Sequence, residues 1–184
     1  MITYIHVRAR SARETTGFII CGERRFPCII GRAGRRFQKR EGDGASPIGV
    51  WQLGKLFFRS DRVAVPRSGL RPRKISPFAG WCDDQNSMHY NRAVKLPYGA
   101  NHEEMFREDC AYNLVVTTDH NQRPRIKGHG SAIFFHLMRP DSKVTAGCVA
   151  VSEHDMRLIL AECGPKTKLV IWPAIGDLRL GFQK

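Results

Sequence analysis

The chain has 184 residues, enough for one ordinary domain with a buried core and too few for two. Its hydrophobic share of 42% is typical of a globular protein, and no stretch approaches the ~20 consecutive apolar residues that a membrane-spanning helix needs. Lys and Arg number 30 against 17 Asp and Glu, and the formal charge of +13 favours polyanionic or carboxylate-rich partners. We therefore expect a single soluble domain over residues 1–184 with one site.

The positive charge makes nucleic acid the first alternative partner. The basic residues are scattered along the chain, however, and no aromatic residues are interleaved with them as platforms for base stacking. This pattern disfavours nucleic acid. If the protein is not an enzyme, the alternative is a basic module that binds nucleic acid or cell wall.

Short runs rich in β-branched and aromatic residues recur along the chain, with Gly and Pro between them. They predict a mainly β domain. The predicted strands cover residues 2–7, 17–21, 25–30, 50–53, 113–118, 132–137 and 168–172. The segment from Arg59 to Tyr98 is rich in Arg and Pro and shows no clear pattern, and a segment of this length without regular structure is usually functional or disordered.

One helix is indicated near the end of the chain. Ser152 is a good N-cap, Asp155 lies in the first turn, where a carboxylate is favourable, and apolar residues follow at helical spacing up to Cys163. A glycine and a proline come next and should end the helix. A second, weaker helix is predicted over residues 101–109.

The six cysteines include no C-x-x-C pair, which argues against a zinc knuckle or a thioredoxin-type redox site. If one of them stays free for catalysis, the other five cannot all pair within the chain, and this fits a reducing compartment. Residues 1–10 lack the basic region and apolar run of a secretory signal. Either the chain is cytoplasmic or its leader is missing.

Residues 131–151 carry the most chemical information. An apolar strand ends in His136, a short polar loop follows, and a turn of small residues presents Cys148. A thiol is only slightly ionised at neutral pH, and a nearby imidazole can take its proton while the sulfur attacks a carbonyl. Gly147 would let a substrate approach the backbone, whose amides around Gly147 and Cys148 could form an oxyanion hole. The alternative is a buried structural cysteine with a core histidine, and spacing alone does not decide between the two.

A histidine followed by Thr145-x-Gly-Cys148 resembles the signature of the L,D-transpeptidase catalytic domain, or YkuD, family. A second block, Lys39-Arg-Glu-Gly-Asp-Gly-Ala-Ser-Pro-Ile-Gly49, resembles the family's upstream Gly-Asp-Gly-x-(Ser/Thr)-Pro-x-Gly element. The two blocks lie about ninety residues apart in the expected order. The resemblance spans residues 29–172 and implies a β-sandwich with one helix directly after the catalytic cysteine turn.

Further blocks are similar to a short subgroup of this family, namely residues 80–84, 89–92, 96–98 and 130–136. Three departures from better-known members concern the site. The gap between His136 and Cys148 is shorter, which implies a different lid over the acyl site. Leu137 stands where many members have glycine, and Ala150 replaces a frequent Arg or Asn. These departures bear on the choice of substrate more than on the type of reaction.

The resemblance implies that Cys148 attacks the carbonyl between an L-centre and a D-centre of a peptidoglycan stem peptide and forms a thioester, with His136 as the base. An amine of a second stem then gives a cross-link, whereas water makes the same site an L,D-carboxypeptidase, which is the alternative enzyme. No cofactor is implied, and carbapenem-type inhibitors are expected to acylate the nucleophile. Because the polymer lies outside the cytoplasmic membrane, the resemblance implies a periplasmic or cell-wall location despite the N-terminal sequence.

Stem peptides carry free carboxylates, for which Arg side chains near the site are suitable partners. Two loop histidines and a polar cluster that follows the tryptophan loop are further candidates, with ordinary surface positions as the alternative. The candidate substrate-binding residues are Thr145, His129, His120, Tyr90, Asn91, Arg92 and Arg139.

Two other chemistries fit the spacing poorly. Gly42-Asp-Gly44 lacks the Lys-Ser ending and the strand-to-helix setting of a phosphate-binding loop. The histidines at 120, 129 and 136, taken with Cys148, match no common metal-ligand spacing, so no metal site is predicted.

Overall fold

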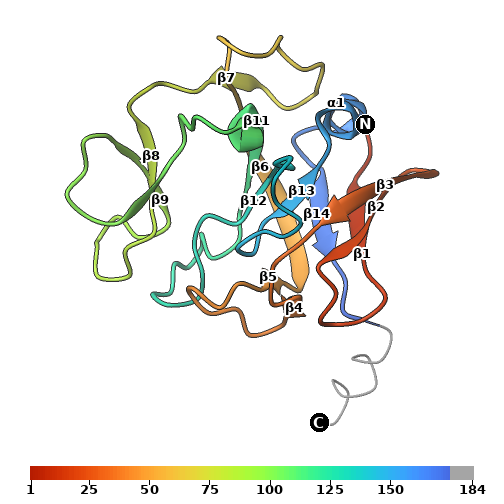
Figure 1. Cartoon of the computed structure of the whole chain (residues 1–184), viewed down its shortest axis with the longest axis horizontal. Coiled ribbons are helices and arrows are strands. Elements are labelled where there is room, and N and C mark those ends of the chain that lie inside the picture. Colours follow the sequence, from red (N-terminus) through yellow and green to blue (C-terminus); the bar gives the residue numbers. More distant parts are fainter. Residues whose placement is uncertain (175–184) are drawn as a thin grey trace.

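The strands of the chain form one large sheet and two small ones in a computed structural model that describes residues 1–174 (Figure 1). The strands are β1 (Tyr4–Arg8), β2 (Thr16–Cys21), β3 (Arg24–Ile29), β4 (Arg35–Arg36), β5 (Ser46–Pro47), β6 (Gly49–Phe58), β7 (Pro72–Lys74), β8 (Ala79–Cys82), β9 (Arg92–Lys95), β10 (His102–Glu104), β11 (Leu114–Thr118), β12 (Phe134–Leu137), β13 (Val149–Val151) and β14 (Lys168–Ile171). A 3₁₀ turn, η1 (Cys110–Tyr112), and one α-helix, α1 (Glu153–Glu162), complete the elements of the described residues.

The large sheet has nine strands in the order β11-β12-β13-β3-β2-β1-β14-β6-β7. Strand β6 also pairs with β11, so the sheet turns back on itself and its inner faces enclose the main core. Alternation along the strands directs apolar side chains inward, as with Ile5 and Val7 of β1, both fully buried. The predicted mainly β fold of sandwich type is confirmed.

Helix α1 follows β13 directly, as predicted. The hydroxyl of Ser152 accepts a hydrogen bond from the amide of Asp155 at 3.1 Å, and Met156, Ile159 and Leu160 are buried beneath the helix. The chain leaves the helix at Cys163, whose backbone is extended. Within residues 1–174 no helix has the length and apolar character needed to cross a membrane.

The second predicted helix, over residues 101–109, is wrong. Residues 102–104 instead form the edge strand β10, which pairs with β8, and a turn follows. Met105 is 4% exposed and belongs to a small second core with Trp81. The burial of Met105 therefore reflects packing of a loop against a sheet. The turn that follows β10 brings Glu103 and Arg107, four residues apart, into an ion pair.

The unassigned segment from Arg59 to Tyr98 contains regular structure. Strands β8 and β9 pair within it, and β10 adds to the other edge of β8, so that a three-stranded sheet stands beside the large one (Figure 1). Its strands have only three or four residues each, too few to show a periodic pattern. This small sheet covers the second core, to which Cys148 also belongs.

Candidate active site

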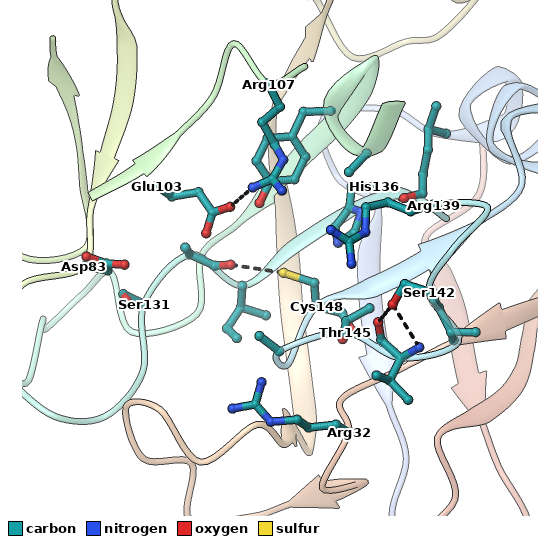
Figure 2. A pocket seen from close by; sticks show the side chains of 18 of the residues that line it. Arg32, Asp83, Glu103, Arg107, Ser131, His136, Arg139, Ser142, Thr145 and Cys148 are labelled. Carbon is teal, nitrogen blue, oxygen red and sulfur yellow. Dashed lines mark hydrogen bonds and ion pairs between the residues drawn. The ribbon is translucent and has the colours of Figure 1, made fainter. Parts of the chain in front are cut away.

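His136 lies on β12, and Cys148 immediately precedes the neighbouring parallel strand β13. His136 of β12 pairs with Ala150 of β13, and Cys148 precedes Ala150 by two positions, so alternation places both side chains on the same face of the sheet. Both line a cavity of about 420 Å³ between the large sheet and the small one (Figure 2). The cysteine comes from the turn that enters β13, and the histidine from near the end of β12.

The thiol of Cys148 is held by the backbone of the neighbouring strand. Its Sγ donates to the carbonyl of Ala132 at 3.1 Å and accepts from the amide of Phe134 at 3.3 Å. Burial raises the pKa of Cys148 to about 12, and the hydrogen bond from Phe134 only partly offsets this. In this state Cys148 is a neutral thiol.

The imidazole of His136 has a defined tautomer. Its Nδ1 lies 2.8 Å from the carbonyl oxygen of Leu137. Because a carbonyl can only accept a hydrogen bond, Nδ1 carries the proton and Nε2 carries the lone pair. Burial lowers the pKa of His136 to about 4. The ring of Tyr112 stands edge-on to it at 5.3 Å between centroids. His136 is therefore a neutral base at physiological pH.

No direct hydrogen bond joins His136 to Cys148 in the described part of the chain, because the thiol points to the carbonyl of Ala132 instead. Rotation about the Cα–Cβ bond of Cys148 is the one internal motion that redirects the sulfur. The pair therefore has the chemistry of a nucleophile and its base, in a resting arrangement.

The turn before Cys148 is braced from within. The hydroxyl of Thr145 donates to the carbonyl of Cys148 at 2.7 Å and accepts from the amide of Gly147 at 3.1 Å. Gly147 has a φ of +139°, and a Cβ there would meet the carbonyl oxygen of Ala45 at 2.8 Å. Since the amide of Gly147 is engaged by Thr145, its contribution to an oxyanion hole stays a prediction.

The upstream block, residues 39–49, packs directly behind this turn. The hydroxyl of Ser46 accepts from the amide of Gly31 at 3.0 Å and lies 3.3 Å from the carbonyl of Cys148, to which it donates. Asp43 accepts from the amide of Ala45 and pairs with the ammonium of Lys39 at 2.5 Å. Burial would raise the pKa of Asp43, but the hydrogen bonds it accepts, that of Lys39 first, outweigh this and lower it. The two motifs thus form one structural unit.

A family model of the L,D-transpeptidase catalytic domain, YkuD, matches residues 3–171. The chain belongs to this family. The match covers nearly the whole chain and extends the resemblance over residues 29–172 to include β1 and β2. The protein is therefore a cysteine-dependent enzyme of the L,D-transpeptidase family, whose members act on peptidoglycan stem peptides. No curated protein matches the chain significantly.

Two of the candidate substrate-binding residues of this L,D-transpeptidase domain line the cavity with Cys148. Thr145 lies on the cysteine turn, and Arg139 follows β12. The guanidinium of Arg139 lies 3.4 Å from Asp109 and 3.6 Å from Asp141, and its side chain is 38% exposed. These long pairs leave Arg139 able to take a further anionic partner.

Tyr90 and Asn91 lie behind the cavity wall. The hydroxyl of Tyr90 donates to Glu41 at 2.5 Å, and Glu41 itself lines the cavity. Asn91 is 1% exposed and accepts from the indole of Trp81 at 2.9 Å. Both side chains are engaged with the protein, so direct contact with substrate stays a prediction for them.

The remaining candidates line other depressions. His120 and His129 border a second cavity of about 570 Å³, in which His120 Nε2 lies 3.1 Å from the carbonyl of His129. Arg92 lies in a third, beside Lys55. Within residues 1–174 no group of three or more His, Cys, Asp or Glu side chains is placed to hold a metal ion.

Sequence reasoning missed most of the charged wall of the cavity. Arg107 binds both carboxylate oxygens of Asp109, at 2.9 and 2.7 Å. It also pairs with Glu103 at 2.6 Å, a contact that Figure 2 shows. Burial raises the pKa of Glu103 despite this pair. Asp83 lies on the same side, and burial raises its pKa too. Glu103, Arg107 and Asp109 all lie in the segment over residues 101–109 that was predicted as a helix, so their meeting at the cavity was not expected.

Proposed function

We propose that this enzyme cross-links peptidoglycan stem peptides through a thioester on Cys148. The observation that carries the proposal is the placement of a cysteine thiol and a neutral imidazole on one face of a sheet, in a cavity of about 420 Å³ with charged walls. Such a cavity is large enough for a few residues of an extended peptide. The family match supports the reaction class, and the geometry supports the roles of the two residues.

The first half-reaction consumes the donor stem. Cys148 turns from the carbonyl of Ala132 and gives its proton to Nε2 of His136 while the sulfur adds to the substrate carbonyl. The tetrahedral intermediate collapses with cleavage of the C–N bond, and His136 returns the proton to the departing amine. The thioester then occupies the floor of the cavity.

The second half-reaction uses an amine of the acceptor stem, which attacks the thioester, gives its proton to His136 and releases the thiol. Carboxylates on one side of the cavity favour an amine as acceptor. Glu41, Asp83 and Glu103 line it, and Asp83 Oδ1 is buried without a hydrogen-bond partner within residues 1–174. A carboxylate in this setting suits an ammonium ion. Hydrolysis by water, the alternative, needs no such group.

The test combines a tetrapeptide donor with an amine-bearing acceptor stem and follows intact protein and products by mass spectrometry. We expect a covalent adduct on Cys148, a cross-linked dimer, and a loss of both in Cys148→Ala. Cys110→Ala is the matched control, since Cys110 is also a free thiol but donates to the carbonyl of Met138 outside the cavity. An adduct that survives Cys148→Ala contradicts the proposal, and release of the shortened donor without dimer assigns the activity to the carboxypeptidase instead.

A carbapenem provides an independent measurement of the nucleophile, because a strained acyl donor needs no acceptor stem. We expect it to acylate Cys148 and not Cys110. We place the activity at the cell wall, where its polymer lies, and fractionation of cells with an antibody to the protein tests this location.

A further inference from the structure

Among residues 1–174, Arg32 is the cation of the cavity wall that takes part in no ion pair. It lies on the loop after β3, is exposed, and lines the cavity that contains Cys148 (Figure 2). None of the ion pairs found among residues 1–174 includes it. A guanidinium that faces a substrate cavity without a carboxylate of its own is available to an anionic ligand.

The other two arginines of this cavity each have carboxylate partners in the protein. Arg107 is held by Asp109 and Glu103 at 2.6 to 2.9 Å. Arg139 lies 3.4 Å from Asp109 and 3.6 Å from Asp141. The positive charge of these two is therefore offset in part by the protein, whereas that of Arg32 is not.

The backbone of Arg32 is attached to the catalytic turn. Its amide donates to the carbonyl of Thr145 at 2.8 Å, and the carbonyl of Ile30 accepts from the amide of Thr145 at 3.0 Å. Thr145 in turn braces the carbonyl of Cys148. Arg32 thus has a fixed position relative to the nucleophile, although its side chain is exposed.

Gly44 of the upstream block supports the side chain of Arg32. A Cβ on Gly44 would meet Nε of Arg32 at 2.8 Å and Cγ at 2.9 Å. Gly44 also has a φ of +67°, so two independent constraints favour glycine here. The stem of Arg32 lies across this residue, and Arg32 lines the cavity.

We propose that Arg32 is a specificity-determining residue that pairs with a free carboxylate of the stem peptide bound at Cys148. The proposal rests on the proposed function and names the chemistry of its substrate. A guanidinium matches a carboxylate with two parallel hydrogen bonds, which fixes orientation as well as charge. With Asp83 and Glu41 elsewhere on the wall, the cavity then distinguishes the anionic part of a stem peptide from its ammonium group.

The test measures binding, separately from turnover. In a Cys148→Ala background, the dissociation constant of a tetrapeptide with free carboxyl groups is compared with those of peptides amidated at one carboxyl at a time. Loss of a hydrogen-bonded charge pair corresponds to about 10- to 100-fold weaker binding. We expect Arg32→Ala to weaken binding of the free peptide by about this factor. One of the amidated peptides lacks the carboxylate that pairs with Arg32, and we expect Arg32→Ala to leave the binding of that peptide unchanged.

Two control variants separate this role from a structural one. Arg36→Ala removes an exposed arginine of the same segment that does not line the cavity, and should leave binding unchanged. Gly44→Ala should weaken binding of the free peptide by displacing Arg32. Gly22→Ala, at a similar φ of +60° with nothing within 4 Å of the added Cβ, should not.

Equal loss for free and amidated peptides, or no loss in Arg32→Ala, overturns the proposal. So does a failure of the Cys148→Ala protein to bind the free peptide. The proposed function fails on a different result, namely the absence of a thioester on Cys148 in the unsubstituted protein. If binding depends on the carboxylate but no acylation occurs, Arg32 keeps its proposed role in binding the carboxylate, and only the proposed thioester chemistry is contradicted.

Discussion

The hydroxyl of Ser46 joins the amide of Gly31 to the carbonyl of Cys148, across 102 residues of sequence between Ser46 and Cys148. It is the physical link between the two sequence blocks that resemble signatures of the family. Ser46 is completely buried, so water does not compete for its hydroxyl.

Ser46→Ala should therefore affect both stability and chemistry. The amide of Gly31 loses its acceptor in a buried place, which costs about 1–3 kcal/mol. The carbonyl of Cys148 loses one of the two hydroxyl groups that donate to it. The acylation rate should therefore fall, and its pH dependence should stay the same. Urea unfolding and the rate of adduct formation measure the two effects. Ser60→Ala, at an exposed position of another loop, is the control, and equal results for the two variants would contradict the linking role.

The ion pair of Lys39 and Asp43 fixes the loop beneath the cavity. Their side chains are 5% and 9% exposed. Asp43→Asn leaves a buried ammonium without its counter-charge, and we expect a loss of about 3–5 kcal/mol in the free energy of unfolding. Glu108→Gln removes a carboxylate from an exposed pair with Arg62 and should cost under about 1 kcal/mol.

The double substitution Lys39→Met with Asp43→Asn tests the cause of that loss. Because the uncompensated charge is then gone, part of the stability should return. If Asp43→Asn alone destabilises the protein no more than Glu108→Gln does, the pair does not hold the loop.

Much of the fold was accessible from sequence, because long strands in this chain bury apolar residues at regular intervals. Each predicted strand corresponds to a strand of the large sheet, although β6 extends from Gly49 to Phe58, well beyond the predicted residues 50–53. Buried and exposed side chains alternate poorly in the middle of β6, because Gly54 lies against Thr117 of β11 and supplies no side chain. Local periodicity therefore indicated where strands occur better than where they end.

The small sheet was inaccessible for a different reason. Its strands β8, β9 and β10 have three or four residues, and Met105 and Trp81 are buried by contacts between segments that are distant in sequence. The same holds for the charged wall that Arg107 organises. Cys148 and His136 could be proposed because their motif is local and specific, whereas Arg32 required knowing that its loop lies over Gly44.

Gly147 should not tolerate a side chain. Its φ of +139° is unfavourable for any other residue, and a Cβ would lie 2.8 Å from the carbonyl oxygen of Ala45. We expect Gly147→Ala to cost about 1–3 kcal/mol and to displace the turn that carries Cys148, which lowers the acylation rate sharply. Gly99→Ala, where an added Cβ meets nothing within 4 Å, is the matched control. Full activity in Gly147→Ala would show that the turn adapts.

The ionisation of Cys148 and His136, the proposed catalytic pair, makes a prediction about pH. With the pKa of Cys148 near 12 and that of His136 near 4, the free enzyme between these values holds a neutral thiol and a neutral imidazole. Alkylation of Cys148 by iodoacetamide needs the thiolate, so its rate should rise about tenfold per pH unit from pH 7 to pH 10. Acylation by the stem peptide needs the neutral base, so it should fall only as the pH drops through about 4. His136→Ala should abolish acylation and leave the alkylation profile unchanged. An alkylation rate that is high and constant from pH 5 to pH 8 would instead reveal a thiolate–imidazolium pair, and peptide mapping of the modified cysteine distinguishes the two profiles.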